Sequence, residues 1–206
     1  MAVGRPTCER PRYPGSYMPA VVSMLRAVNV GGHNKVRMEA LRSLYESLGL
    51  REVETFIQSG NVIFLTEKRD LKRLAATIAD GIEHSFAFRP EVILRTAADL
   101  RAVLASNPFA ARPGLDPTKL LVAFLSREPD REALEKVLGI KADPEELRIE
   151  GRELFVYFPN GMARPKLSLA LIERTLKTPA TGRNWNTVGK LLDIAERLEA
   201  PPPARP

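Results

Sequence analysis

The spacing of hydrophobic residues changes along this chain in one order, and that order occurs twice. Residues 21–105 contain short, nearly continuous apolar runs, separated by segments in which apolar residues recur every three or four positions. Residues 118–199 show the same succession. Short apolar runs predict buried strands, and the longer spacing predicts amphipathic helices. Each half is therefore expected to run strand, helix, strand, strand, helix, strand, helix.

The bounds of the expected elements follow from these runs and from the residues that interrupt them. In the first half we expect strands at 21–29, 52–58, 61–65 and 91–95, and helices at 37–48, at 70–86 and from Thr96 onward. In the second half we expect strands at 119–125, 146–149, 153–158 and 180–184, and helices after Pro129, at 165–176 and from Asn186 or Thr187 onward. Thr96, Asn186 and Thr187 are of the residue types that cap helix N-termini, so helices are expected to begin beside them.

The order of these elements indicates the fold class. A β-α-β-β-α-β succession is that of a split βαβ, or ferredoxin-like, unit. The sequence thus predicts an α+β fold of two tandem ferredoxin-like (α/β plait) units, each a four-stranded antiparallel sheet with helices on one face. The second face of each sheet needs a cover: the other lobe, the extra helix that ends each half, a ligand, or a second copy of the chain in a homodimer. Ligand sites are common at seams between lobes.

Segments without hydrophobic periodicity divide the chain. Residues 1–19 combine proline, arginine and glycine, and residues 201–206 are mostly proline, so both are expected to be disordered. Between them we expect a first unit with its extra helix at 20–106, a linker at 107–117, and a second unit with its extra helix at 118–200. Met18 stands directly before the first strand, so Met1 and Met18 are both candidates for the biological start.

Composition excludes some classes of protein. The chain has 206 residues, of which 44% are hydrophobic and 27% are charged, and no apolar run is long enough to span a membrane. The single cysteine, Cys8, excludes an internal disulfide and fits a reducing, cytoplasmic location. The formal net charge of +6 makes nucleic acid a partner to consider, but the charges are spread over helices of mixed sign. A basic patch would have to be formed by folding.

Two segments of the first half are candidates for binding an anion. Residues 26–35 contain a Gly-Gly turn between a strand and a helix, and such a turn directs backbone N–H groups at an anion. The alternative is a tight turn in which the glycines only supply positive φ. A hairpin turn explains Gln-Ser-Gly-Asn at 58–61 without any function. The candidate ligand-binding residues of this half are Arg26, Asn29, Gly31, Gly32, Asn34 and Lys35.

Two further candidates lie in the second half. At 182–187, free N–H groups at a helix start and Arg183 suit a phosphate or carboxylate, and Trp185 suits stacking on a base. The alternative is a capped helix whose Trp185 closes the core. As a surface cation, Arg183 would contribute about 1 kcal/mol or less to stability. At 161–166, cations beside a helix start oppose the helix dipole, which hints at an anion. The candidate residues of this half are Arg164, Lys166, Arg183, Asn184, Trp185 and Asn186.

Residue types that carry most enzyme chemistry are scarce. Two histidines and one cysteine do not make a zinc site, and no Ser-His-Asp order or nucleophile elbow is present. His33, in the Gly-Gly loop, is the one candidate general base. The sequence therefore predicts no metal and no cofactor, and it leaves open whether the protein is an enzyme.

Four ordered motifs resemble those of an uncharacterised bacterial family, domain of unknown function 1697. They are R-A-V-N-V-G-G-H-N-K at 26–35, M-x-x-L-R-x-L-x-x-x-L-G at 38–49, Q-S-G-N-V at 58–62 and R-N-W-N-T at 183–187. The resemblance covers residues 20–198 and implies tandem ferredoxin-like units but no established activity. The family typically has Gly at Ala27, Pro at Arg37 and a Gly-Arg-Ser-Lys-like segment at 163–166. The charges survive these changes, whereas the backbone of each loop is expected to differ.

Three functions fit these observations. The first, which we favour, is binding of an anionic ligand, either nucleic acid or a phosphorylated small molecule, in a cleft between the lobes. The others are an enzyme of unknown reaction that uses the same cleft and a structural or oligomeric module without a ligand. The first function requires folding to bring the helix start at 183–187 and the Gly31-Gly32 loop to the same seam.

Overall fold

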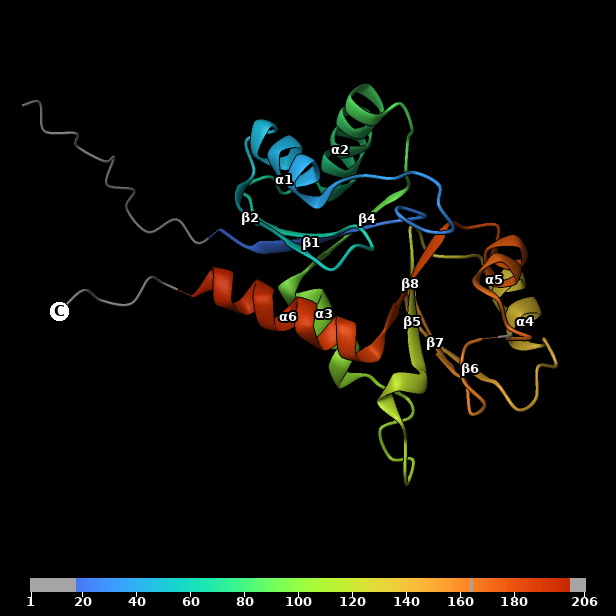
Figure 1. The fold of residues 1–206 in the computed structure, drawn as a ribbon. Coiled ribbons are helices and arrows are strands. Elements are labelled where there is room, and N and C mark those ends of the chain that lie inside the picture. The colour runs from blue at the N-terminus through green and yellow to red at the C-terminus, as the bar shows by residue number, and fades with distance from the viewer. Residues whose placement is uncertain (1–17, 164, 201–206) are drawn as a thin grey trace, which may run out of the picture.

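The computed structural model describes residues 18–163 and 165–200, which form two consecutive units (Figure 1). The first unit contains β1 (Ala20–Leu25), α1 (Met38–Ser47), β2 (Arg51–Phe56), β3 (Asn61–Leu65), α2 (Leu71–Phe86), β4 (Val92–Thr96) and α3 (Ala97–Ala105). The second unit contains η1 (Pro117–Lys119), β5 (Leu120–Leu125), α4 (Arg131–Leu138), β6 (Glu146–Glu150), β7 (Glu153–Tyr157), α5 (Leu169–Leu176), β8 (Ala180–Asn184) and α6 (Trp185–Glu199). The disorder expected at 1–17 and 201–206 concerns residues outside the described part of the chain.

Each unit is built on one four-stranded antiparallel sheet, and the two sheets have equivalent strand orders. The orders are β2-β3-β1-β4 and β6-β7-β5-β8, so the first strand of each unit is central and the last is at an edge. These are the orders of a ferredoxin-like unit. The predicted α+β fold of two tandem ferredoxin-like units is confirmed.

Both faces of each sheet are buried, which explains why the strand runs are almost continuously apolar. In β1, Val21 and Leu25 belong to a core with α1 and α2, whereas Val22 and Met24 belong to a second core on the opposite face. The residues of β5 and β7 alternate in the same way between a core with α4 and α5 and the opposite face. Successive side chains of a strand point to opposite faces, so two buried faces require an unbroken apolar run.

The faces turned away from α1, α2, α4 and α5 share one central core. Leu100 of α3 and Leu191 of α6 are fully buried in this core, between side chains of both sheets. Helix α6 belongs to the second unit in sequence but contacts β1 and β3 of the first. Figure 1 shows α3 and α6 in the angle between the two sheets. The extra helices and the other lobe therefore cover the second faces, and a second copy of the chain is not needed for this purpose.

The first strand is shorter than the apolar run suggests. Strand β1 ends at Leu25 rather than at residue 29, because Ala27 and Asn29 have positive φ angles of 57° and 55°. A residue in this left-handed region cannot continue an extended strand. The segment expected as the end of a strand is therefore a loop at the lobe boundary.

Two helices begin at residues other than those expected. Helix α5 begins at residue 169 rather than 165, because the side chain of Ser168 accepts a hydrogen bond from the backbone N–H of Leu171. Helix α6 begins at residue 185, because Asn184 caps it and accepts from the N–H of Asn186 at 3.0 Å. Thr96 caps α3 as expected. Local hydrogen bonding at the cap, rather than hydrophobic periodicity, determines each first residue.

The central core provides a test of how far the two lobes depend on each other. Leu191 is 0% exposed there, so we expect Leu191→Ala to lower the free energy of unfolding by about 2–5 kcal/mol, measured by urea denaturation. Leu138 of α4 is 50% exposed, and Leu138→Ala is the matched control, with an expected change below about 0.5 kcal/mol. Equal losses in the two variants would contradict a shared core around α6.

Candidate functional site

The loop after β1 and the turn between β2 and β3 are held together by asparagine side chains. Asn29 donates from Nδ2 to the carbonyl oxygens of Gln58, at 2.8 Å, and of Val36, at 3.0 Å. Its Oδ1 accepts from the N–H of Val36 at 2.9 Å. Asn34 donates from Nδ2 to the carbonyl oxygen of Ala27 at 3.0 Å. These polar atoms therefore bind other parts of the loop, and their predicted contact with an anion stays a prediction.

The Gly31-Gly32 segment forms an exposed tight turn. Both glycines have positive φ, 59° and 81°, and the N–H of His33 donates to the carbonyl oxygen of Val30 at 3.1 Å. The conformation is the one that the tight-turn alternative requires. Lys35 is exposed and borders a hollow of about 400 Å³ beside this loop. Binding of an anion at Lys35 also stays a prediction.

Arg183 of β8 connects the second lobe to the end of β1 and to the turn between β2 and β3. Its side chain is buried, and Nε donates to Oδ1 of Asn61 at 2.5 Å. Nη2 donates to the carbonyl oxygens of Leu25 and Ser59, both at 3.1 Å, and Nη1 donates to two acceptors within β8. All five guanidinium N–H groups are thus used by the protein. Folding brings the three motifs together, but it does so through internal hydrogen bonds.

Arg95 of β4 makes the reciprocal connection from the first lobe to the second. Its side chain is 2% exposed, and Nη2 donates to the carbonyl oxygen of Leu125 at 2.9 Å. Nε donates to Oε1 of Glu153 at 2.7 Å, and Nη1 donates to the preceding carbonyl oxygen, that of Leu94. Arg183 likewise bonds the carbonyl oxygen that precedes it. We refer to these two sets of contacts as the arginine clamps.

The pairing registers show that the clamps are equivalent. Arg95 pairs with the third residue of β1, and Arg183 pairs with the third residue of β5. Leu25 and Leu125 are the last residues of β1 and β5, and each accepts from the arginine of the other lobe. Asn61 and Glu153 are the first residues of β3 and β7. Contacts of the form "i to j and j to i" are those of an isologous, two-fold interface.

The two clamps differ in charge. Arg95 is paired with the carboxylate of Glu153, whereas the equivalent partner of Arg183 is the neutral amide of Asn61. Burial lowers the pKa of Arg183 to about 10, so its guanidinium remains charged at neutral pH. Burial also lowers the pKa of Arg95, but the charge of Glu153 opposes this shift. The clamp at Arg183 therefore buries a cation that is satisfied only by neutral oxygens.

Three other predicted residues lie together at the start of α6. Asn184 caps α6 and donates to the carbonyl oxygen of Thr118 at 2.8 Å. Trp185 is half-buried against Phe155, with ring centroids 6.3 Å apart, and packs on the central core. Asn186 is exposed at the start of α6. Their contact with a ligand is not tested by these observations.

The predicted cations Lys166 and Arg26 are bound by acceptors of the second lobe. Lys166 donates from Nζ to the carbonyl oxygen of Asp143, and its backbone N–H donates to Glu145, so its environment is the second lobe alone. Arg164 lies outside the described residues. Arg26 forms an ion pair with Glu173 of α5, with Nε and Nη2 donating to the two carboxylate oxygens at 2.6 and 2.9 Å. Arg26 is thus a link between the lobes.

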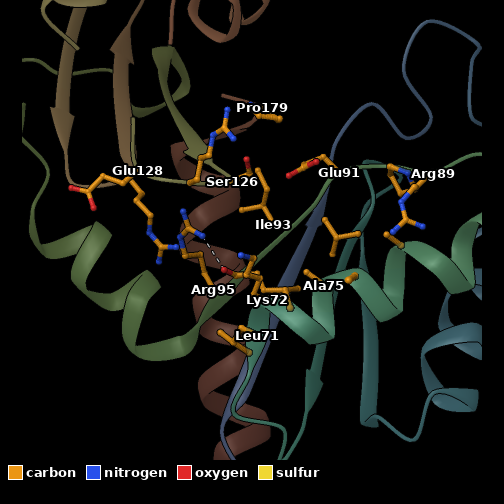
Figure 2. Close-up of a pocket in the computed structure, with 17 residues that line it drawn as sticks. Leu71, Lys72, Ala75, Arg89, Glu91, Ile93, Arg95, Ser126, Glu128 and Pro179 are labelled. Carbon is orange, nitrogen blue, oxygen red and sulfur yellow. Dashed lines mark hydrogen bonds between the residues drawn. The ribbon is translucent and has the colours of Figure 1, made fainter. Parts of the chain in front are cut away.

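A groove of about 700 Å³ lies between the lobes beside the clamp at Arg95. Edge strand β4 lies along it, α2 forms one wall with Lys72 and Ala75, and the second lobe forms the other with Ser126 and Pro179. Figure 2 shows these side chains around the groove, with Glu128 near one end and Arg89 near the other. Neither the glycine-rich loop at 26–35 nor the 183–187 motif contributes a residue to the lining of the groove.

Cations outnumber carboxylates in this groove. The ionisable side chains that line it are Lys72, Glu91, Arg89, Arg95, Arg127, Glu128 and Arg152. Arg89 is paired with Asp80 and Glu83, and Arg127 donates to the carbonyl oxygen of Lys177. The exposed side chains of Lys72 and Arg152 have no hydrogen-bond or ion-pair partner among residues 18–163 and 165–200. Within the described part of the chain, the groove therefore holds one unpaired cation from each lobe, together with the carboxylates of Glu91 and Glu128, which also line it.

Sequence reasoning missed the groove residues because they come from separate segments without a motif. One signal was available, namely the alignment of the two halves by strand ends. In that alignment Ser126 and Arg127 replace Arg26 and Ala27 after the central strand. Arg152 replaces Gly60 before the third strand, and the two residues make equivalent backbone contacts with Leu125 and Leu25. Two cations thus appear in the second half where the first half has Ala and Gly.

The described residues contain neither a metal-binding cluster nor a membrane-spanning helix. Within 18–163 and 165–200, no group of three or more His, Cys, Asp and Glu side chains is placed to hold a metal. In the same part of the chain, no helix combines the length and the apolar character needed to cross a bilayer. The lining of the groove contains neither histidine nor cysteine.

Comparison with known proteins agrees with the resemblance of the motifs. The model of a family described as protein of unknown function (DUF1697) matches residues 18–155. Among solved structures, the chain is similar to the conserved bacterial protein SP0830 from Streptococcus pneumoniae, with 25% sequence identity and a TM-score of 0.66. That similarity covers 86% of this chain and 99% of the other. No curated protein matches the chain significantly.

The burial of Arg183 changes the expected effect of its removal. Arg183→Ala should lower the free energy of unfolding by about 3 kcal/mol, because it leaves buried acceptors of the first lobe without donors. Arg197→Ala is the matched control, since Arg197 pairs with Glu54 at the surface and should contribute about 1 kcal/mol or less. Urea denaturation at neutral pH measures both values. A loss at Arg183 no greater than that at Arg197 would show that the clamp does not join the lobes.

Substitution of Gly60 tests how closely the turn between β2 and β3 packs against β1. A Cβ added to Gly60 would lie 2.9 Å from Cβ of Leu25, and its φ is +71°. Gly114 has a similar φ of +67°, but nothing lies within 4 Å of an added Cβ. Gly114→Ala should cost about 1–2 kcal/mol through backbone strain alone, and Gly60→Ala should cost distinctly more in thermal or urea unfolding. Equal costs would mean that the contact with Leu25 relaxes freely.

Proposed function

The chain belongs to the DUF1697 family of proteins of unknown function, and we propose that it binds a small phosphorylated molecule in the groove between its lobes. The observation that carries the proposal is the pair of exposed cations, Lys72 and Arg152, which border the groove without a partner in the described part of the chain. Because one belongs to each lobe, a single anion between them would be attracted by both.

The position of Lys72 adds to this argument. Lys72 and Arg73 lie in the first turn of α2, which contains no acidic residue itself but is capped by the carboxylate of Asp70. Cations at this end of a helix oppose the helix dipole, at a cost of about 0.3–1 kcal/mol each. A bound anion beside Lys72 would offset this unfavourable placement.

The dimensions of the groove suit a small molecule. Its volume of about 700 Å³ lies within the range typical of small-molecule sites. Beyond Lys72, the wall formed by α2 carries the short side chains of Ala75, Ala76 and Ala79. The apolar wall and the cationic residues together match a ligand with a compact body and a phosphate group.

The coverage of the sheets argues against nucleic acid as the ligand. RNA-binding modules built on a four-stranded sheet stack bases on aromatic residues of its open face. In this chain the corresponding face carries Phe124, Phe155 and Tyr157, and all three are buried in the central core. Bases of a nucleic acid therefore cannot stack on these three side chains.

A thermal-shift screen tests the proposal. Sugar phosphates, mononucleotides and a mixed-sequence single-stranded oligonucleotide would be compared at constant ionic strength. We expect a small phosphorylated compound to raise the melting temperature, and Lys72→Glu and Arg152→Glu each to weaken its binding by about tenfold or more. Lys141→Glu is the matched control, because Lys141 is exposed and does not line the groove.

Three results would contradict the proposal. If no phosphorylated small molecule raises the melting temperature, the protein does not bind this class of ligand. Stabilisation that is abolished by Lys35→Glu but not by the groove variants would move the site to the loop after β1. A response to the oligonucleotide alone, falling steeply with salt, would assign the protein to nucleic-acid binding.

A further inference from the structure

The second lobe contains an internal carboxylate bound to the edge of its sheet. Ala180 begins edge strand β8, and its backbone N–H donates to Oε1 of Glu173 at 2.7 Å. The same carboxylate accepts from Nε and Nη2 of Arg26, at 2.6 and 2.9 Å. An outward N–H at a sheet edge is thus satisfied by an oxyanion, and a guanidinium from the other lobe holds that oxyanion in place.

Val92 is the equivalent of Ala180 in the first lobe. Val92 pairs with the last residue of β1, as Ala180 pairs with the last residue of β5. The N–H of Arg26 donates to the carbonyl oxygen of Glu91, so the alternation of an antiparallel ladder directs the N–H of Val92 away from β1. This N–H has no hydrogen-bond partner within the described ranges, and Val92 lines the groove.

The groups around Val92 differ from those around Ala180 in a consistent way. No carboxylate from α2 is hydrogen-bonded to the open edge of β4, and Ser126 occupies the position of Arg26. Cations reach the groove from other positions instead, namely Arg127, Arg152 and Lys72. The edge N–H at Ala180 is thus occupied by a carboxylate of its own lobe, whereas the edge N–H at Val92 faces a groove that is lined by cations of both lobes and by Glu91 and Glu128.

We propose that an oxyanion of the ligand, a carboxylate or a phosphate, accepts a hydrogen bond from the N–H of Val92, as Glu173 does from the N–H of Ala180. This inference rests on the proposed function and specifies how the groove holds the anionic group. The hydroxyl of Ser126 and the cations from both lobes complete the contact. Glu91 and Glu128 also border the groove, so the ligand contacts the cationic positions and avoids these two carboxylates.

The test follows backbone amides by two-dimensional NMR of the full-length protein. Acetate and inorganic phosphate are titrated separately, with chloride added to keep the ionic strength constant. The amide proton of Val92 should move downfield and saturate, while that of Ala180, already bonded to Glu173, should not respond. The anion that saturates at the lower concentration identifies the group that the groove prefers.

Glu173→Ala provides the internal control. It frees the N–H of Ala180 and the guanidinium of Arg26, so acetate should now shift the Ala180 amide as well and restore thermal stability. Lys72→Glu should raise the half-saturation concentration at Val92 by about tenfold and leave the response of Ala180 in the Glu173→Ala background unchanged.

The outcomes separate this inference from the proposed function. An anion whose binding depends on Lys72 and Arg152 but does not shift the Val92 amide would overturn the inference and leave the proposed function standing. An absence of binding by phosphate, acetate and the phosphorylated compounds would overturn both. A Val92 shift that is linear and identical in Lys72→Glu would indicate a bulk salt effect and overturn the inference.

Discussion

Arg95 and Arg183 lie in the edge strands β4 and β8. The side chain of each donates to the carbonyl oxygen of the last residue in the central strand of the other lobe. A buried guanidinium has to find acceptors for its N–H groups, because an unsatisfied buried charge costs several kcal/mol. Those acceptors are available only in one relative orientation of the lobes. An apolar core tolerates small displacements, whereas a set of directional hydrogen bonds does not. The clamps therefore fix the angle between the sheets, and with it the shape of the groove that lies beside Arg95.

The reciprocity of the clamps makes the chain comparable to a two-fold dimer whose halves are joined covalently. In a true dimer, every change in one corner of the interface would also occur in the other. A single chain is free to change the corners separately, and here it has done so. Beside Ala180, at the start of β8, the interface holds Arg26 and Glu173. At the equivalent place beside Val92, at the start of β4, it holds Ser126, Arg127 and Arg152. The clamp partners differ as well, as Asn61 and Glu153. The chemistry specific to the groove therefore lies in the positions where the halves differ.

The fold followed from the sequence because the inner strands β1, β3, β5 and β7 are buried on both faces, which makes their apolar runs nearly continuous and easy to recognise. The end of β1 and the start of α6 were less predictable. They depend on the positive φ of Ala27 and on the cap at Asn184, and the spacing of hydrophobic residues indicates neither feature. The site was harder for another reason. A charged residue in a central motif suggested a ligand, but Arg183 is satisfied by neutral oxygens, and no sequence pattern identifies a backbone carbonyl as the partner of an arginine. The groove residues come from α2, from β4 and the segment before it, and from three loops of the second lobe, and they converge only when the lobes are docked.

The loop after β1 can now be understood through its backbone. Left-handed residues are concentrated in it and in the neighbouring turn, and they include the β-branched Ile57, with φ of 51°. A β-branched residue in this region is strained by about 1–2 kcal/mol. The strained turn is held by Asn29, and it presents the Ser59 carbonyl oxygen and the side chain of Asn61 to Arg183. The motifs that look like a binding site are therefore the parts that set the orientation of the lobes. The motifs and the groove lining are therefore separable: the motifs hold the docked lobes, whereas the residues at positions 72, 126, 127 and 152 line the groove, and under the proposed function they would determine which anion it accepts.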